Sequence, residues 1–294
     1  MMGLVQPMFD GPVDVIGDIH GDWDALQRLL SHLGYDSRGE HPESRRMVFV
    51  GDFVDRGPKN VDVVRFVRGL IQDGRAQSVL GNHELNLLLD KRKTDNEWFF
   101  ANETDEEIRE ELLEFFRTLP LVLFRDDARV VHACWQPEMV DMASESQDVV
   151  ALFQQHRFTI DIGLAKRSDL KPWQKEMRHQ NLNPVKVLTS GLEVQSTSPF
   201  MMSGKKKTLE RFPWWMEYDD EPFCFFGHYS LPSDRPRGST HAICVDFGLS
   251  KRWVGTAKEF PQELYRLGAY RLPEHLTFFD NGEKWSRDGE DEIR

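Results

Sequence analysis

The chain has 294 residues, of which 39% are hydrophobic and 29% are charged. This composition supplies enough apolar side chains for a substantial core and excludes a largely disordered chain. The net charge of -12 provides no general attraction to a polyanion, so we expect no stable nucleic-acid partner. A phosphate substrate is not excluded, because bound cations would offset part of the acidic charge.

The three cysteines, Cys134, Cys224 and Cys244, are widely spaced and form no CxxC pair. We therefore expect buried thiols in a reducing compartment and no disulfide framework. The sequence shows no apolar stretch long enough to span a bilayer, and residues 1–10 lack the pattern of a signal peptide. The prediction is a cytoplasmic protein that makes no membrane contact.

Strands and helices are predicted to alternate in the first part of the chain. Short apolar runs predict three buried strands, at Val13–Ile16, Met47–Val50 and Gln77–Leu80. Helical spacing of apolar residues predicts one helix that ends at Gly34, another from Asn60 to Gly74, and a third after Gly81. Taken by itself, this alternation indicates an α/β fold with one parallel sheet and right-handed crossovers.

The pattern changes in the second part of the chain. An acidic helix is predicted from Asp105 to Leu119, and a fourth strand, Val130-Val131, leads into His132. From about Asp148 to Trp215 the alternation lapses, which predicts an insertion over the site at residues 148–215 of a single domain spanning residues 1–294. Later strands are predicted at Phe223–Phe226, Ala242–Val245 and Leu276–Phe279.

The predicted insertion permits two interpretations. The basic run Lys205–Lys207 is most simply a solvated loop. Alternatively, together with Trp173, Trp214 and Trp215, it would stack a base and hold phosphates. The tryptophans are equally compatible with packing in a core.

Polar residues suited to metal binding follow the predicted strands. Each of the first three strands leads into a glycine and such residues: Gly17-Asp18-Ile19-His20-Gly21, Gly51-Asp52-Phe53-Val54-Asp55-Arg56-Gly57 and Gly81-Asn82-His83-Glu84. His132 and His228 follow two later strands. The candidate ligands combine oxygen and nitrogen donors: Asp18, His20, Asp52, Asn82, His132 and His228. This set suits two divalent or trivalent ions of Mn, Fe, Zn or Co, with Asp52 as the bridging carboxylate.

Two such metals predict hydrolysis of a phosphoester. Held about 3.5–4 Å apart, they activate a bridging water and clamp the phosphoryl oxygens. Arg56 is placed to bind the phosphate, with Asn82 as a further substrate contact. His83 suits the general acid that protonates the leaving oxygen, and Asp55 suits the partner that orients it. Asp246 is interpreted as a strand-terminal Asx turn or an indirect contact rather than a ligand.

The three N-terminal motifs resemble the GDxHG, GDxVDRG and GNHE motifs of the phosphoprotein phosphatase (PPP) family within the calcineurin-like metallophosphoesterases. Leu80, where eukaryotic protein phosphatases of this family usually carry Arg, makes the chain more similar to bacterial members, including the symmetrical diadenosine tetraphosphatases. The resemblance implies a β-sandwich flanked by helices. It also implies the two ligand sets: Asp18, His20 and Asp52 for one metal, and Asp52, Asn82, His132 and His228 for the other.

The preferred prediction for function is dimetal-dependent hydrolysis of a phosphomonoester, including phosphorylated Ser or Thr side chains, with Mn as the first choice of metal. The enzymatic alternative is hydrolysis of a dinucleoside polyphosphate or another nucleotide phosphodiester. An alternative of another class is a catalytically silent phosphate-binding module. The presence of Asp55, Arg56 and His83 beside the ligands disfavours the silent module.

Overall fold

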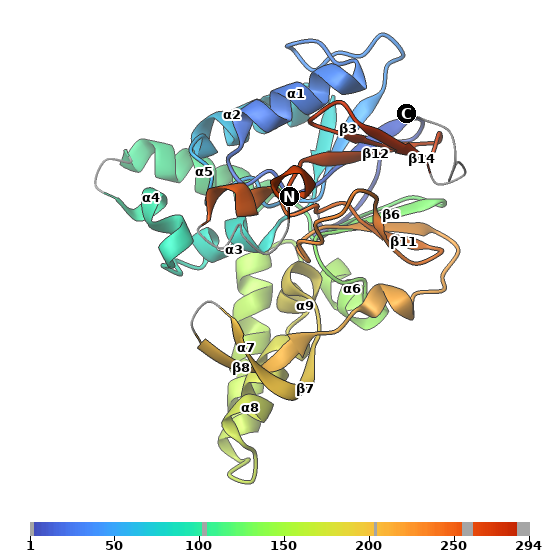
Figure 1. Ribbon diagram of the computed structural model, residues 1–294. Helices are drawn as coiled ribbons and strands as arrows, with labels where there is room; N and C mark the ends of the chain where they lie inside the picture. The colour runs from blue at the N-terminus through green and yellow to red at the C-terminus, as the bar shows by residue number, and fades with distance from the viewer. Residues whose placement is uncertain (1–2, 102–104, 203–204, 255–260, 287–294) are drawn as a thin grey trace.

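Two six-stranded sheets pack face to face in the computed structural model, which describes residues 3–101, 105–202, 205–254 and 261–286 (Figure 1). The first sheet has the order β14 (Lys284–Ser286), β13 (Leu276–Phe279), β12 (Gly268–Leu272), β2 (Val13–Ile16), β3 (Arg46–Phe49) and β4 (Ala76–Ser78). The second has the order β1 (Val5–Pro7), β5 (Val122–Phe124), β6 (Ala128–Val131), β9 (Phe223–Phe226), β11 (Ala242–Cys244) and β10 (Arg237–Gly238). The α/β sandwich implied by the family resemblance is confirmed.

The single parallel sheet that alternation alone indicates is wrong. Strands β2, β3 and β4 do pair in parallel, as expected. However, β12 pairs antiparallel with β2, where Ala269 lies opposite Ile16, and the second sheet covers the inner face. Strand β12 comes from the end of the chain, so its pairing depends on contacts that a local pattern does not reveal.

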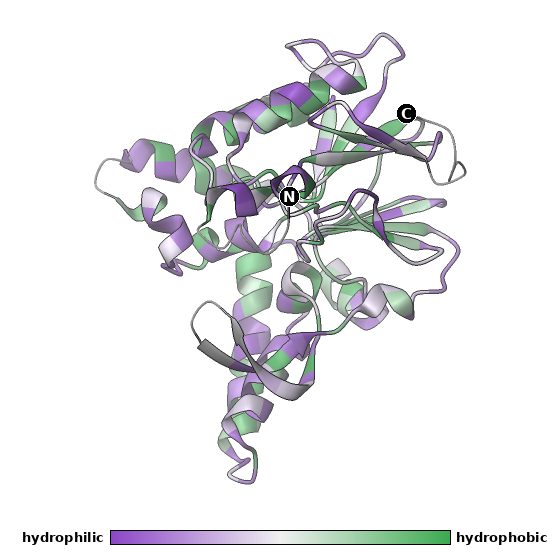
Figure 2. Cartoon of the chain, in the orientation of Figure 1, coloured by the Kyte–Doolittle hydropathy of each residue, from purple (hydrophilic) through white to green (hydrophobic). Residues whose placement is uncertain are grey.

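The side chains of the strands alternate between two hydrophobic clusters. Val15 and Val48 point between the sheets, where they share a cluster with Phe225 of β9. Their neighbours Ile16 and Phe49 belong to the outer cluster, which the helices cover. Figure 2 shows apolar residues concentrated along the strands and hydrophilic residues on the exposed surfaces of the helices. Because these strands are buried on both faces, their sequences are nearly continuous runs of apolar residues.

Helices pack on the outer faces of the sandwich. Helix α1 (Trp23–Leu33) begins after Asp22, whose carboxylate accepts from the Ala25 N–H, and ends at Gly34 with a φ of 96°. The next helical elements are α2 (Asn60–Gln72), α3 (Asn82–Leu88), η1 (Thr94–Asn96), α4 (Glu97–Phe100), α5 (Glu106–Thr118) and α6 (Pro137–Ser144). Late 3-10 turns are η3 (Leu249–Trp253) and η4 (Gln262–Leu264). None of the helices in the described ranges combines the length and apolar content needed to cross a bilayer.

The segment predicted as an insertion projects away from the sandwich as helices and a hairpin (Figure 1). It comprises α7 (Val149–Ala165), α8 (Pro172–Asn181), α9 (Pro184–Ser190), β7 (Glu193–Met202), β8 (Lys205–Arg211) and η2 (Trp214–Met216). Trp214 and Trp215 pack on Phe226 of β9, with ring centroids 5.0 and 5.1 Å away, so they join the core. The Lys205–Lys207 run lies in β8 and not in a loop, and the side chains of Lys205 and Lys206 lie outside the described residues.

Candidate metal centre and active site

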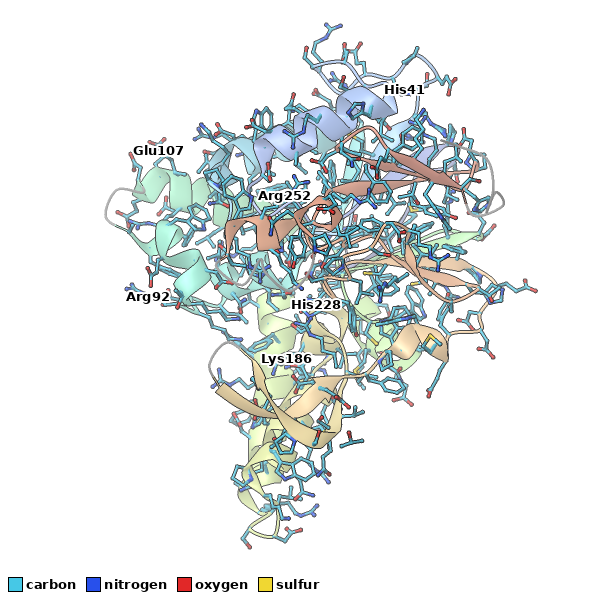
Figure 3. The ribbon with its side chains drawn as sticks, viewed as in Figure 1. His41, Arg92, Glu107, Lys186, His228 and Arg252 are labelled. Atoms are coloured by element: carbon cyan, nitrogen blue, oxygen red, sulfur yellow. The ribbon has the colours of Figure 1, made fainter. Side chains whose placement is uncertain are left out.

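Five strands deliver polar residues to one end of the sandwich. Strands β2, β3 and β4 are parallel neighbours, and so are β6 and β9 in the opposite sheet, so their carboxyl ends meet across the sandwich. The structure brings all six predicted ligands together there: Asp18, His20, Asp52, Asn82, His132 and His228. Figure 3 shows His228 between the sandwich and the projecting segment.

Asp52 lies at the middle of the group. Its Oδ2 atom is 3.7 Å from His20 Nε2, 3.4 Å from His132 Nε2 and 3.9 Å from His83 Nε2. Its Oδ1 atom instead accepts from the backbone N–H of His83 at 3.0 Å. Because Oδ1 is engaged with the backbone, Oδ2 is the carboxylate oxygen that faces the imidazoles.

Backbone carbonyls set the orientation of two imidazoles. His20 Nδ1 lies 3.0 Å from the Val54 carbonyl oxygen, and His132 Nδ1 lies 2.7 Å from that of Val50. A carbonyl accepts, so Nδ1–H is the donor and Nε2 keeps its lone pair toward the site. His132 Nε2 then faces the Asn82 Oδ1 atom at 3.3 Å. Two lone pairs at this distance repel unless a cation or a proton lies between them.

Two further buried atoms fit a role as metal ligands. Among the described residues, neither Asp18 Oδ1 nor His228 Nε2 has a hydrogen-bond partner. The other oxygen of Asp18 accepts from the His228 backbone N–H at 3.0 Å. A buried acceptor without a partner costs about 1–3 kcal/mol, and bound cations would remove that cost at both atoms. The mixed oxygen and nitrogen set therefore fits two first-row metal ions.

Burial and crowding perturb the carboxylates of this group. Burial raises the pKa of Asp18 well above its usual range, and the charges of Asp246 and Asp52 add to the effect. Burial also acts to raise the pKa of Asp52, but His132 and His83 outweigh it and hold that pKa well below its usual range. Strongly perturbed groups that cluster at one strand end indicate a functional site.

The guanidinium of Arg56 lies beside the candidate ligands. Its Nη1 donates to Ser250 Oγ at 2.8 Å and lies 3.1 Å from His20 Nε2, and its Nη2 lies 3.3 Å from His83 Nε2. The Arg56 side chain is 27% exposed, so an incoming anion can reach it. A planar cation in this position suits a phosphate oxygen next to the metals.

Asp55 and His83 form the pair that the sequence predicts. Asp55 Oδ2 lies 2.5 Å from His83 Nδ1, and both side chains are almost completely buried. Burial acts to lower the pKa of His83, but Asp52 and the hydrogen bond to Asp55 outweigh it and raise that pKa. Burial raises the pKa of Asp55 as well, but the short hydrogen bond and the nearby Asp52 charge favour the protonated imidazole, which is the form that a general acid requires.

The comparisons with known proteins address the same residues. The model of the family "Calcineurin-like phosphoesterase" matches residues 11–242, which include all six candidate ligands. The chain belongs to this family. Its α/β sandwich places the motifs at strand ends, in agreement with the predicted resemblance.

Several curated proteins that resemble this chain are named as tetraphosphatases. The chain is 45% identical over 73 residues to the asymmetrical bis(5'-nucleosyl)-tetraphosphatase of Bacillus subtilis, covering 24% of this chain and 30% of that one. It is 35% identical over 144 residues to the symmetrical enzyme of Methylococcus capsulatus, covering 46% of this chain and 49% of that one. The matches thus span about half the length of these relatives or less.

A solved structure shares the phosphoesterase fold over most of its length. The cold-active protein-tyrosine phosphatase of a psychrophilic Shewanella species superposes with a TM-score of 0.57 at 17% identity. The match covers 95% of this chain and 81% of that one. At this identity the likeness shows the fold alone.

Some residues that shape the phosphoesterase site carry no prediction from the sequence. Glu84 is completely buried, and its carboxylate accepts from the backbone N–H groups of Asp52 (2.9 Å), Phe53 (2.8 Å) and Gly81 (3.1 Å). Glu84 therefore holds the Asp52 loop against the start of α3. The available signal is its place in the GNHE motif, as the third residue of a helix whose cap is Gly81.

No sequence motif points to three other residues near the site, which are Trp98, Asp95 and Ser250. Asp95 Oδ2 lies 3.7 Å from Arg56 Nε and 3.9 Å from His83 Nδ1. All three lie outside the motifs, on 3-10 turns or the short helix α4. Asp246 is confirmed as an Asx turn, since its Oδ1 accepts from the Gly248 N–H at 2.8 Å while its Oδ2 accepts from the Ser230 N–H at 2.5 Å.

The phosphoesterase motifs impose an uncommon backbone on the site. Four of their non-glycine residues have positive φ: His20 (48°), Asp52 (53°), Asp55 (75°) and Arg56 (74°), and so does His228 (69°) outside the motifs. Such conformations persist where surrounding contacts over-determine them, and they concentrate at functional sites. The packing is also tight, because a Cβ on Gly227 would lie 2.1 Å from Asp18 Oδ1.

Proposed function

We propose that this chain is a dimetal-dependent phosphoester hydrolase. The observation that carries the proposal is Asp52 Oδ2, a single carboxylate oxygen within 3.9 Å of three imidazole Nε2 atoms. Asp18, His20 and Asp52 would hold one metal. The other would be held by Asp52, Asn82, His132 and His228. When bound, the metals supply an activated water and neutralise charge on the phosphoryl oxygens.

The remaining residues position the substrate and move a proton. Arg56 binds the phosphate, and its contact with Ser250 restricts the guanidinium before substrate arrives. Asn82 adds a contact from the start of α3. His83 donates a proton to the leaving oxygen, while Asp55 keeps the imidazole oriented and charged. These retained groups argue against a catalytically silent phosphate-binding module.

We further propose that the substrate is a bis(5'-nucleosyl) tetraphosphate. Support comes from relatives of two kinds, symmetrical and asymmetrical, that carry this substrate in their names. A phosphomonoester, such as phosphoserine or phosphothreonine in a peptide, remains the second candidate because the same metal and arginine arrangement serves it. Mn is the first metal to supply, followed by Fe, Zn or Co. A cytoplasmic location is proposed because the three cysteines are buried and free.

The test compares D52N with the wild type in the presence of Mn. Turnover is measured on diadenosine tetraphosphate, a phosphopeptide panel and p-nitrophenyl phosphate, and bound metal is measured by elemental analysis. Loss of the bridging carboxylate should lower metal content and reduce turnover by orders of magnitude. The matched control is D141N on the exposed side of α6, which should behave as wild type. Unchanged turnover by D52N would overturn the proposed centre.

A further inference from the structure

Four basic residues meet where the projecting segment joins the sandwich. Lys91 and Lys93 follow helix α3, Arg157 lies on α7, and Lys186 lies on α9. We call these four residues the junction cluster. They are separate from the run Lys205–Lys207, and the reaction described above uses none of them.

Side-chain contacts tie the three helices together at this point. The Lys91 ammonium lies 4.6 Å from the centre of the Phe153 ring on α7, one turn before Arg157. The Phe153 carbonyl oxygen accepts from Asn183 Nδ2 at 2.9 Å. Asn183 Oδ1 in turn accepts from the Lys186 backbone N–H at 3.3 Å. These contacts fix the Lys91 ammonium against α7 and hold together the two helices that carry Arg157 and Lys186.

The positive charge of the junction cluster is only partly compensated, because Glu193 and Glu176 lie near Lys186 but the neighbours that act on Lys91 are all cations. In the described ranges, no carboxylate oxygen lies within 4.0 Å of the ammonium groups of Lys91, Lys93 or Lys186. Arg157 has one carboxylate partner, Asp161, at 3.8 Å on the exposed side of α7. Burial, with the charges of Lys186 and Lys93, lowers the pKa of Lys91 to about 8. Partly buried cations that repel one another are what an anion would stabilise.

One short loop links the junction cluster to the acid pair. Asn96 is fully buried; its Nδ2 donates to the Lys91 carbonyl at 2.9 Å, and its Oδ1 accepts from the Lys93 N–H at 2.8 Å. Asp95, two residues after Lys93, contacts Arg56. Two residues span at most about 7 Å, so the backbone of Lys93 lies within about 7 Å of Asp95, the residue that contacts Arg56.

Helix α9 makes a second link to the metal centre. The Ala133 N–H, next to the candidate ligand His132, donates to the Leu188 carbonyl oxygen of α9 at 2.9 Å. Lys186 lies two residues earlier on the same helix. In the view of Figure 3, Lys186 and His228 are both seen near the join between the sandwich and the projecting segment.

We propose that the junction cluster is a second anion site that binds a chain of linked phosphates. It would hold the phosphates beyond the one that the metal centre attacks, and so would favour polyphosphate substrates over small monoesters. This inference rests on the proposed hydrolase function for its biological meaning. The cluster itself lies outside the candidate metal ligands, so its anion binding can be measured without turnover.

The experiment measures binding of inorganic tripolyphosphate to the full chain by calorimetry in metal-free buffer at pH 7. The double variant K91M/K186M removes two charges and keeps the apolar stems, including the one that packs on Phe153. We expect tripolyphosphate affinity to fall about tenfold or more, as for other charge-assisted contacts. The control K166M/K171M removes the same charge from exposed positions and should bind as wild type.

The variant K93E checks the result without disturbing a packed side chain, since Lys93 is exposed. It should also weaken tripolyphosphate binding. Wild-type affinity in both K91M/K186M and K93E would overturn the proposal, and so would an equal loss in K166M/K171M. Failure of the wild type to turn over any substrate would count against the proposed function but would leave this binding result intact.

Kinetics then test whether the second site serves the substrate. For diadenosine tetraphosphate, kcat/KM of K91M/K186M should fall about tenfold or more, while that for p-nitrophenyl phosphate, which has no further phosphates, should stay at the wild-type value. Equal losses on both substrates would contradict a role in substrate selection. Weakened tripolyphosphate binding with unchanged diadenosine tetraphosphate kinetics would assign the site to bare polyphosphate instead.

Discussion

The indole N–H of Trp98 donates to Asp55 Oδ1 at 2.8 Å. The other oxygen of Asp55 lies 2.5 Å from His83 Nδ1, so both oxygens of this buried carboxylate are engaged. Trp98 lies on α4, directly after the loop that carries Asp95. A residue outside the recognised motifs thereby fixes the direction in which Asp55 presents its charge to His83.

Replacing Trp98 with Phe should reduce kcat. The variant W98F keeps an aromatic ring beside Phe99 but removes the N–H donor to Asp55. Hydrogen bonds to charged groups contribute about 1.5–3 kcal/mol, and a partial loss of that size lowers the rate about tenfold. The measurement is kcat on p-nitrophenyl phosphate with Mn, together with bound metal, which should not change. W173F on α8 is the matched control; a wild-type kcat in W98F would show that Trp98 does not position Asp55.

Replacing His83 with Ala should slow the reaction while leaving metal bound. General acid catalysis contributes roughly a hundredfold to ten-thousandfold in rate, so kcat should fall within that range. Elemental analysis of H83A should give a metal content near that of the wild type, in contrast to D52N. His83 Nε2 does lie 3.9 Å from Asp52 Oδ2, so a metal content as low as that of D52N would reassign His83 as a ligand.

Replacing Glu84 with Gln should destabilise the loop that presents Asp52. The carboxylate accepts from four backbone N–H groups, those of Asp52, Phe53, Val54 and Gly81, and an amide has one acceptor oxygen in place of two. We expect the free energy of unfolding in urea to fall by about 1–3 kcal/mol, the usual cost of a buried group left unpaired. The control is E110Q on the exposed surface of α5. Equal stability of the two variants would show that Glu84 does not hold the loop.

The stability contribution of Lys91 should depend on pH. Burial and the charges of Lys186, Lys93 and Arg157 lower the pKa of Lys91 from 10.5 to about 8 in the folded protein. Between these two values the unfolded chain binds the proton more strongly, so stability rises with pH. The free energy of unfolding of wild type minus that of K91M should therefore increase from about pH 8 to pH 10.5.

Urea titrations across that pH window provide the measurement. The control compares wild type with K166M over the same pH range, because Lys166 is exposed. A difference between wild type and K91M that stays constant with pH would contradict the lowered pKa. The affinity for tripolyphosphate should decline over the same window, since the neutral amine no longer attracts the anion.

Local patterns predict much of the fold. The bounds of β2, β9 and β13 match the predicted Val13–Ile16, Phe223–Phe226 and Leu276–Phe279. The reason is physical: a buried strand needs an apolar run, and the polar residue after it lies at the edge of the sheet. The same regularity predicts that Asp18, Asp52 and His132 lie near one another.

Pairings between distant segments are not predictable in this way. No local pattern predicts strand β12, although it lies between β2 and β13, and the lapse in alternation gives no sign of the helices α7, α8 and α9. An apolar stripe marks a helix clearly only when the opposite face is polar, whereas α7 also carries Phe158 and Ile162 on its exposed side. Its inner face packs against α9, a contact that the local pattern does not reveal.

The sequence by itself determined where the candidate ligands, the arginine and the proposed acid lie along the chain, because strand ends and motif residues carry them in short local patterns. Only the tertiary structure decided how these groups are held and what surrounds them. The Trp98 indole donates to Asp55, 43 positions away, and the Lys91 ammonium lies over the Phe153 ring of the projecting segment. Such contacts depend on packing between elements that are distant in the sequence. This packing leaves no periodic pattern from which the contacts could be predicted.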